Sequence, residues 1–383
     1  MQSTHSMQPF KLERYFAMYE FSTKYLLCVS DCEALAMGDV VAMADAECQA
    51  LWSGLKLGYT ESQGLPLLRQ EVVKAMYPSL TSEQVLVLAP EEGIYLSMRA
   101  LLQPSDHVVC VTPGYQSLYE IARSIGCDVT PWNVREIKDH PNHAQEFNID
   151  ELEALLRPNT KLVVINFPHN PTGLTLTRAQ LDRIVALCQA RGAYLFSDEM
   201  YRYLEHDAST RLPPACELYD RAISLFGMSK SFGMPGLRVG WIATKDKAAF
   251  ARVAELKDYT TICSSAPSEI LALIGLRARE QLIARNVATI KRGLAAVQAF
   301  MDKHRDKFAF HAPTAGPIAF PKILIPGMTA SAYSDMLVRD AGILLLPSGL
   351  YEVEDNRFRV SFGRVNTPEV VEAWDAFVNQ AGK

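Results

Sequence analysis

Short runs of β-branched and aliphatic residues alternate with helical patterns through the middle of the chain. The strand candidates are QVLVLA (84–89), HVVCVTP (107–113), KLVVINFP (161–168), AYLFSDE (193–199), AISLFGM (222–228) and RVGWIAT (238–244). Between them lie stretches such as 177–192, where Leu181, Ile184, Val185 and Cys188 recur at helical spacing. This alternation predicts an α/β domain with a mostly parallel, mixed sheet that helices cover on both faces.

The two ends of the chain have a different character. After about residue 285, a long helix pattern leads into shorter strand-like runs, and the first 45 or so residues contain no clear sheet core. We therefore predict a large domain over 46–285 and a smaller α+β domain built from 1–45 and 286–383. A length of 383 residues exceeds the usual span of one domain, which agrees with this division.

Charge and cysteine usage exclude several classes of partner. The formal net charge is −5 without any basic block, which argues against nucleic acid or an anionic membrane as the main partner. The sequence has neither an apolar leader nor an apolar run long enough to span a membrane. The eight cysteines include no CxxC pair and no cluster with metal-ligand spacing, so we expect core thiols, no metal site and a cytoplasmic location.

Three of the strand candidates run into polar residues: NFPHNPTG (166–173), SDEMYRY (197–203) and LFGMSKSFGMPGLRVGW (225–241). Ligands of open α/β sheets bind beyond the carboxyl ends of parallel strands, so these runs are expected to meet in one crevice. Lys230 stands in the most apolar of them, where loss of hydration disfavours the charged amine. It is either a misplaced surface lysine or an amine kept neutral for nucleophilic work.

The motifs NPTG, SDEMY and SKSFGMPGLRVGW, followed by RVSFG, occur here in the order and at the spacing of class I/II aminotransferases. Over residues 50–370 the chain thus resembles enzymes of fold type I that depend on pyridoxal 5'-phosphate (PLP). The resemblance implies transfer of an amino group from an α-amino acid to a 2-oxo acid, with PLP as the cofactor.

The resemblance also implies a role for each residue around the cofactor ring. Lys230 would carry PLP as a Schiff base and move the substrate proton, and Asp198 would keep the ring nitrogen protonated. Asn170 and Tyr201 would bond to the phenolic oxygen of the ring, and Tyr115 would stack on its face. The structural alternatives are a helix cap for Asp198, a turn residue for Asn170 and a core tyrosine for Tyr115.

Other matched residues would hold the phosphate and the substrate. Arg238 would bind the phosphate with its planar fork, assisted by Ser229 and by Tyr59 of a neighbouring subunit, which implies a homodimer with shared active sites. Arg359 would clamp the α-carboxylate of the substrate next to Asn170. The alternatives here are a turn aromatic for Tyr59, a structural salt bridge for Arg359, and Arg357, two residues away, as the carboxylate-binding arginine.

The chain departs from the family around the phosphate. The serine that commonly lies three residues before the lysine is Gly227 here, and the usual Gly-Ala turn reads Ala89–Pro90–Glu91. Proline lacks an N–H, so the amides of Glu91 and Glu92 are the candidates for binding phosphate. Two carboxylates near a dianion are unfavourable, so one of them is a candidate to face the substrate instead.

The segment 20–39 also lacks the Gly-x-Pro run of many relatives. Its Ser30, Asp31 and Glu33 are candidates either to meet a substrate side chain, such as a cationic one, or to cap the helix that follows.

Two other functions were weighed. A PLP-dependent lyase or cyclase would use the same scaffold on an amino acid such as an arginine-derived one, as capreomycidine synthase does, because the fold does not settle the reaction. A ligand-sensing domain of a transcription regulator is disfavoured, because only some 45 non-basic residues precede the matched region. Nucleotide binding by a G-x-G-x-x-G turn is excluded by its absence after any strand candidate.

Overall fold

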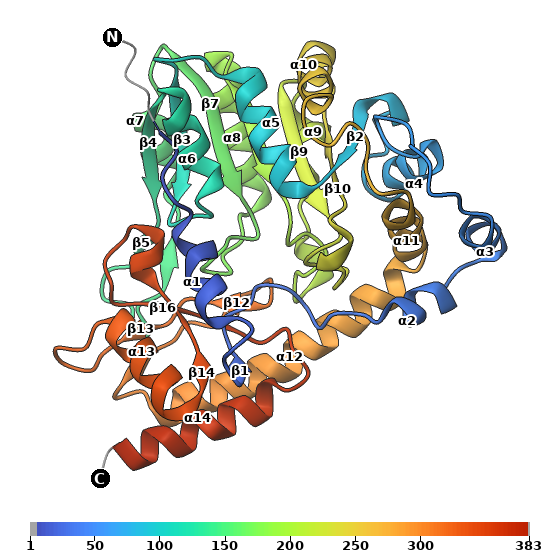
Figure 1. The fold of residues 1–383 in the computed structure, drawn as a ribbon. Helices are drawn as coiled ribbons and strands as arrows, with labels where there is room; N and C mark the ends of the chain where they lie inside the picture. The colour runs from blue at the N-terminus through green and yellow to red at the C-terminus, as the bar shows by residue number, and fades with distance from the viewer. Residues whose placement is uncertain (1–5, 382–383) are drawn as a thin grey trace.

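The computed structural model describes residues 6–381, and a seven-stranded sheet in the order β2-β10-β9-β8-β7-β3-β4 forms its centre (Figure 1). The strands are β2 (Val85–Leu88), β3 (His107–Thr112), β4 (Asp128–Asn133), β7 (Thr160–Asn166), β8 (Tyr194–Asp198), β9 (Ala222–Gly227) and β10 (Gly240–Ala243). Strands β9, β8, β7, β3 and β4 pair in parallel, whereas β10 runs antiparallel to both β2 and β9. The predicted mixed, mostly parallel sheet is confirmed. The additional strand β4 lies at the sheet edge, where its polar residues and Pro131 are tolerated.

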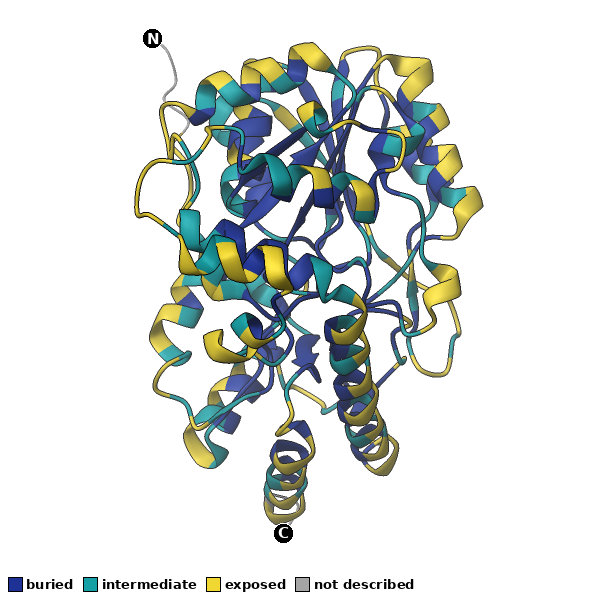
Figure 2. Cartoon of the chain, turned by 90° about the vertical axis from the view of Figure 1, so that its right-hand side faces the viewer, coloured by how far each residue is buried: buried dark blue, intermediate teal, exposed yellow. Residues whose placement is uncertain are grey.

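Helices cover both faces of this sheet, and the strands between them are buried (Figures 1 and 2). Side chains alternate along a strand, so Val108 and Cys110 face one helical layer while Val109 and Val111 face the other. The first layer contains α5 (Pro90–Leu101), α6 (Ser117–Ile125) and α10 (Lys247–Lys257). The second contains α7 (Ile149–Leu155), α8 (Arg178–Arg191) and α9 (Ala215–Leu218).

A further group of helices packs around β2 and β10. It consists of α2 (Met37–Ala42), α3 (Ala46–Ser53), α4 (Pro66–Met76) and α11 (Ala266–Arg277). Trp241 of β10 is fully buried in this cluster, and its Nε1 donates to the hydroxyl of Tyr77, 3.2 Å away.

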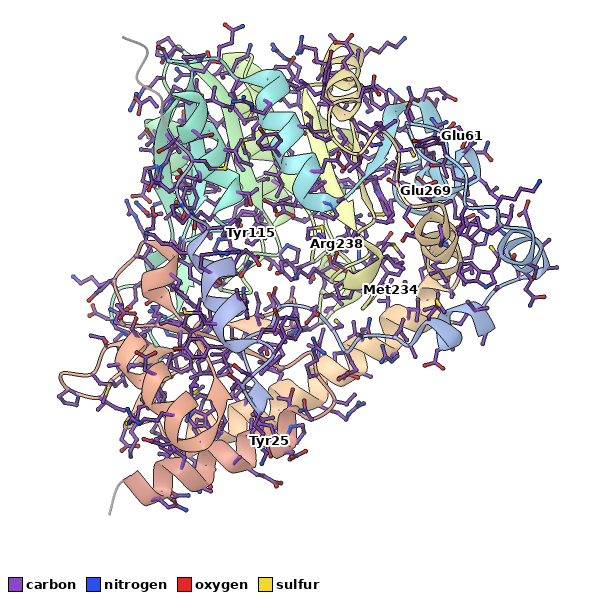
Figure 3. All side chains as sticks on the ribbon, in the orientation of Figure 1. Tyr25, Glu61, Tyr115, Met234, Arg238 and Glu269 are labelled. Atoms are coloured by element: carbon purple, nitrogen blue, oxygen red, sulfur yellow. The ribbon has the colours of Figure 1, made fainter. Side chains whose placement is uncertain are left out.

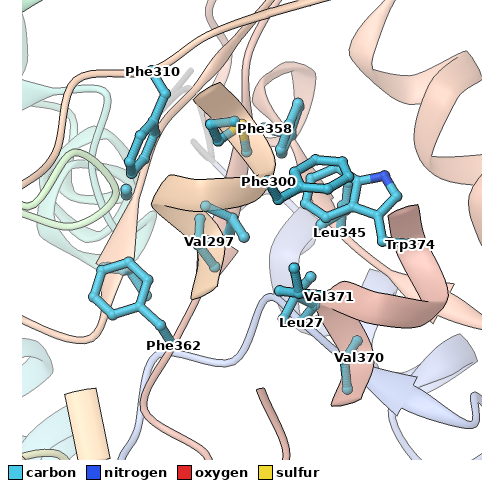
Figure 4. Close-up of a cluster of buried hydrophobic side chains, with 14 of the residues drawn as sticks. Leu27, Val297, Phe300, Phe310, Leu345, Phe358, Phe362, Val370, Val371 and Trp374 are labelled. Carbon is cyan, nitrogen blue, oxygen red and sulfur yellow. The ribbon is translucent and has the colours of Figure 1, made fainter. Parts of the chain in front are cut away.

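The C-terminal third forms a second core with short strands. Its elements are α12 (Arg279–Lys303), β11 (Phe308–Ala309), β12 (Ile318–Ala319), β13 (Lys322–Ile323), α13 (Ala330–Ala341), β14 (Ile343–Leu344), β15 (Leu346–Pro347), β16 (Phe358–Ser361) and α14 (Thr367–Ala381). Aromatic side chains fill this core: Trp374 stacks on Phe300 with ring centroids 4.1 Å apart, and Phe358 packs against both rings' cluster (Figure 4).

The N-terminal segment contacts both cores. Helix α1 (Lys11–Tyr19) lies between the sheet and the C-terminal elements, and β1 (Tyr25–Leu26) pairs in parallel with β14 (Figure 1). Helices α2 and α3 pack instead on α11. A small hairpin of β5 (Arg135–Glu136) and β6 (Gln145–Glu146) completes the strands. The division into 46–285 and the two chain ends is retained as a proposal.

None of the helices within residues 6–381 is both long and apolar enough to cross a membrane.

Close packing in the second core predicts the effect of a single methyl group. A Cβ added at Gly293 of α12 would lie 2.5 Å from the carbonyl oxygen of Phe362. We expect Gly293→Ala to reduce the free energy of unfolding by about 1–3 kcal/mol, because the backbone of Phe362 must move. The matched control is Gly38→Ala in α2, where no atom lies within 4 Å of the added Cβ. Thermal unfolding of both variants checks this, and equal shifts in Tm would contradict it.

Candidate active site

The carboxyl ends of β7, β8 and β9 open into one cavity of about 210 Å³, which α1 and β16 close from the other side. Its lining includes predicted site residues from both cores: Glu91, Tyr115, Asn170, Asp198, Tyr201, Ser229, Lys230, Arg238 and Arg359. Tyr115 and Arg238 lie at the edge of the sheet that faces α1 (Figure 3). The expected convergence of the three polar runs is therefore present in the structure.

Lys230 follows β9, and its amine lies in the cavity rather than on the outer surface. Nζ donates a hydrogen bond to Oγ of Ser30 at 3.0 Å. Burial lowers the pKa of this amine, and the nearby charges of Arg359 and Arg238 lower it further, while Asp31 and Glu13 act in the opposite direction. An amine in these surroundings loses its proton more readily than a solvated lysine, which is what nucleophilic use requires.

Asp198 ends β8 and is only 5% exposed. Its Oδ1 accepts a hydrogen bond from the backbone N–H of Met200 at 3.1 Å, and Oδ2 has no donor among the described residues. Burial raises the pKa of this carboxyl to about 7, and the charges of Glu91 and Glu199 add to the effect. A turn rather than a helix follows Asp198, so the helix-cap alternative is wrong.

Glu199 lies on the opposite face of the sheet from Asp198, as strand alternation requires. Its Oε1 accepts hydrogen bonds from the N–H of Ala215 at 2.9 Å and from Oγ of Ser224 at 2.8 Å.

A buried network joins Arg359 of β16 to the NPTG loop. Arg359 is 2% exposed, and its Nη1 donates to Oδ1 of Asn170 at 2.9 Å and to the hydroxyl of Tyr351 at 3.0 Å. Its Nε donates to the carbonyl oxygen of Cys28 at 2.8 Å. Nη2 has no acceptor within the part of the chain that the structure describes, so it is available to a carboxylate ligand. Sequence reasoning missed Tyr351, because no motif surrounds it.

Arg357 has a different environment from Arg359. Its Nη2 donates to Oε2 of Glu136 at 2.6 Å, and its Nη1 donates to the carbonyl oxygen of Phe320 at 3.1 Å. Arg357 therefore forms a structural ion pair outside the cavity lining.

Two buried groups fix the loops around the ring site. The N–H of Asn170 donates to Oδ1 of Asn166 at 2.9 Å, and Nδ2 of Asn166 donates to the carbonyl oxygen of Asp198 at 3.0 Å. The role of Asn166 was also missed, although it begins the quoted motif. The hydroxyl of Tyr115 donates to Oε1 of Glu13 at 3.1 Å, and burial raises the pKa of both Tyr115 and Tyr201.

The two departures near the phosphate end are in contact with each other. A Cβ added at Gly227 would lie 2.7 Å from Cγ of Pro90, so the proline ring occupies the space that a serine at 227 would need. Arg238 lines this end of the cavity, and its only side-chain hydrogen bond among the described residues is to the carbonyl oxygen of Pro235, 3.1 Å away. Its fork thus stays available to an anion.

Several predicted residues take other positions. The carboxylate of Glu92 accepts hydrogen bonds from the N–H of Ala89 at 3.3 Å and from Oγ1 of Thr261 at 2.9 Å, so it caps α5 and does not line the cavity. Glu91 does line the cavity and accepts a hydrogen bond from Oγ of Ser117. Tyr59 is 91% exposed and lies outside the lining of this single chain.

The segment 20–39 does not cap the following helix. That helix, α2, begins at Met37, and its N-cap Ala36 makes no side-chain bond, so the capping alternative for Ser30, Asp31 and Glu33 is wrong. Asp31 instead accepts from Nη2 of Arg364 at 3.0 Å, and Glu33 accepts from a backbone N–H.

The contact between Pro90 and Gly227 can be tested by stability. We expect Gly227→Ser to reduce the free energy of unfolding by about 1–3 kcal/mol, because the added side chain overpacks against the proline ring. Pro90→Ala should restore much of this loss in the double variant, although it costs stability alone. Unfolding midpoints of both single variants and the double variant measure the coupling, and strictly additive losses would contradict the contact.

Three comparisons with known proteins agree with this geometry. The family model described as aminotransferase class I and II matches residues 22–377. Capreomycidine synthase of Streptomyces vinaceus is 29% identical over 301 residues, which cover 79% of this chain and 75% of that protein. A PLP-dependent aminotransferase from Streptococcus suis 89-1591 superimposes with a TM-score of 0.89 at 26% identity, over 98% of both chains. The PLP-dependent cyclase OrfR superimposes with a TM-score of 0.87 at 25% identity, also over 98% of both chains.

The groups in the cavity fit PLP. Lys230 offers an amine to the aldehyde, Asp198 offers an open carboxylate oxygen to a protonated ring nitrogen, and Arg238 offers a planar cation to the phosphate. The chain therefore belongs to the aminotransferase class I and II family and is a PLP-dependent enzyme.

Proposed function

We propose that this enzyme transfers the amino group of an α-amino acid to a 2-oxo acid. The observation that carries the proposal is the meeting of Lys230, Asp198 and Arg359 in one cavity. These three side chains provide a neutralisable amine, a carboxylate for the cofactor ring and a cation for the substrate carboxylate.

When bound, PLP supplies an aldehyde that takes up amines and a ring that withdraws electrons from the substrate Cα. Lys230 would hold the aldehyde, Asp198 the ring nitrogen, and Asn170 and Tyr201 the ring oxygen. Tyr115 would cover the ring face.

The phosphate would be held by Arg238 and Ser229, with the N–H of Glu91 at the start of α5 as a further donor.

The chain's own residues then act on the substrate. Arg359 binds the α-carboxylate through Nη2, while its bonds to Asn170, Tyr351 and Cys28 fix the direction of the guanidinium. The orientation places the Cα–H bond toward Lys230. Nζ of Lys230, held uncharged by burial, accepts the proton from Cα.

A second function is a lyase or cyclase reaction on the same site. Two relatives favour it: capreomycidine synthase and the cyclase OrfR. Both reactions begin with removal of the Cα proton, so the residues above would serve either one. They differ in whether a substituent leaves from Cβ before the amino group is transferred.

We also propose that the enzyme is a cytoplasmic homodimer in which Tyr59 reaches the phosphate site of the partner. Leu57, Tyr59 and Tyr259 support this, because a single chain leaves these three large side chains exposed.

The half-reaction distinguishes the two functions. Enzyme loaded with PLP is mixed with one amino acid at a time, without any 2-oxo acid. Transamination predicts about one 2-oxo acid product per site, then arrest with the cofactor in its aminated form, because the cofactor itself holds the amino group. Addition of a 2-oxo acid should restore the original absorbance. Continuous turnover without a 2-oxo acid would instead support the lyase or cyclase.

The two arginines of β16 and its preceding residue give a matched pair of variants. We expect Arg359→Lys to raise the KM for α-amino acids about 10- to 100-fold, because a point charge loses the planar fork and its bonds to the carboxylate. Arg357→Lys should leave KM near that of the wild type, since Arg357 pairs with Glu136 outside the cavity. Steady-state kinetics at saturating PLP measure both. A comparable rise in KM for the two variants would remove Arg359 from substrate binding.

A further inference from the structure

The cavity contains carboxylates that no cation balances. Its acidic lining residues are Glu20, Asp31, Glu91 and Asp198. Asp31 pairs with Arg364, and Asp198 turns its open Oδ2 toward the cavity, where the cofactor ring would take it. Neither Glu20 nor Glu91 forms an ion pair with any Lys, Arg or His within residues 6–381.

The cations of the same cavity have other uses in the proposed function. The phosphate would neutralise Arg238, and the α-carboxylate of the substrate would neutralise Arg359. Lys230 is held uncharged by burial. Binding of the cofactor and of the common part of an amino acid therefore leaves Glu20 and Glu91 without a counter-charge.

The surroundings of these two carboxylates are acidic and poorly solvated. Burial raises the pKa of Glu20, and the charges of Asp31 and Glu13 raise it further. Burial also raises the pKa of Glu91, again with a contribution from Glu13. Glu20 makes no side-chain hydrogen bond to the described residues, whereas Glu91 accepts one from Ser117. Like charges at short range in a partly desolvated site are relieved by a cation.

Helix α1 adds an apolar wall beside these carboxylates. Leu12 and Phe16 line the cavity from the same face of α1, and Glu20 follows one turn later. The guanidinium carbon of Arg359 lies 6.0 Å from the centre of the Phe16 ring. An amino acid whose carboxylate binds Arg359 would therefore place an aliphatic stem along Phe16 and Leu12, as long cationic side chains do.

We propose that the amino acid on which this enzyme acts has a cationic side chain, a guanidinium or an ammonium, that binds the carboxylates of Glu20 and Glu91. The inference rests on the proposed function, because it uses Arg359 as the site of the α-carboxylate. A charged hydrogen bond to each carboxylate would compensate its loss of water. An acidic side chain would be repelled, and a neutral one would leave both carboxylates unpaired.

Matched pairs of amino acids test this on the PLP-loaded enzyme. Arginine and citrulline have nearly the same shape but differ in charge, as do lysine and norleucine. The kcat/KM for consumption of each compound and its apparent Kd from the cofactor absorbance are measured. We expect at least one cationic member to exceed its neutral partner by about tenfold or more, the effect of one charged contact.

Charge-neutralising variants assign the preference to residues. Glu20→Gln and Glu91→Gln should each reduce the cationic-to-neutral ratio about fivefold or more, while the kcat/KM of the neutral partner stays within about twofold. Glu255→Gln is the control, because Glu255 is an exposed carboxylate on α10 outside the cavity lining. Retained activity on the neutral partner shows that each variant is folded.

Three results would overturn the inference. Neutral amino acids could react as well as their cationic partners, or the ratio could survive both Glu→Gln changes; in either case the proposed function would stand. If no amino acid of either charge alters the cofactor absorbance or is consumed, the proposed function fails, and the inference fails with it.

Discussion

Desolvation of the Lys230 amine is the constraint on which the other features of the site depend. The amine must be buried to lose its proton, yet a bound molecule must reach it, so it lies in a cavity at the sheet edge. Its hydrogen-bond partner among the described residues is the neutral hydroxyl of Ser30, not a carboxylate. Asp31 is the neighbouring charge that most favours the protonated amine, and its ion pair with Arg364 weakens that effect.

The same cavity depends on contacts between segments far apart in the chain. Arg359 lies 189 residues from Asn170 and 331 residues from Cys28, and it donates hydrogen bonds to both. Removing Arg359 would leave buried acceptors without donors, so substrate recognition and the junction of the two cores share one side chain. Because Nη2 adds a ligand to an already ordered guanidinium, little side-chain entropy is lost when a carboxylate binds.

Much of the fold and part of the site could be predicted from the sequence. Strands ending at NFPHNPTG, SDEMYRY and Lys230 had to meet, because parallel strands present their carboxyl ends at one edge. The outcomes for Glu91 and Glu92 could not be predicted, since neighbouring helical residues point about 100° apart and the capping bond of Glu92 decides which one faces inward. The contacts of Pro90 with Gly227 and of Arg359 with Tyr351 depend on packing between distant segments, which no local pattern encodes.

The central claim is that Lys230 carries the cofactor, and reductive trapping tests it most directly. Enzyme loaded with PLP is treated with borohydride, which reduces the bond between the cofactor aldehyde and a lysine amine, and the labelled peptide is then sequenced by mass spectrometry. The account predicts one label per chain, on Lys230. Label on Lys257 would contradict it; this lysine is 1% exposed but donates to the carbonyl oxygens of Ser62 and Ile262. Absence of any stable label would contradict it equally.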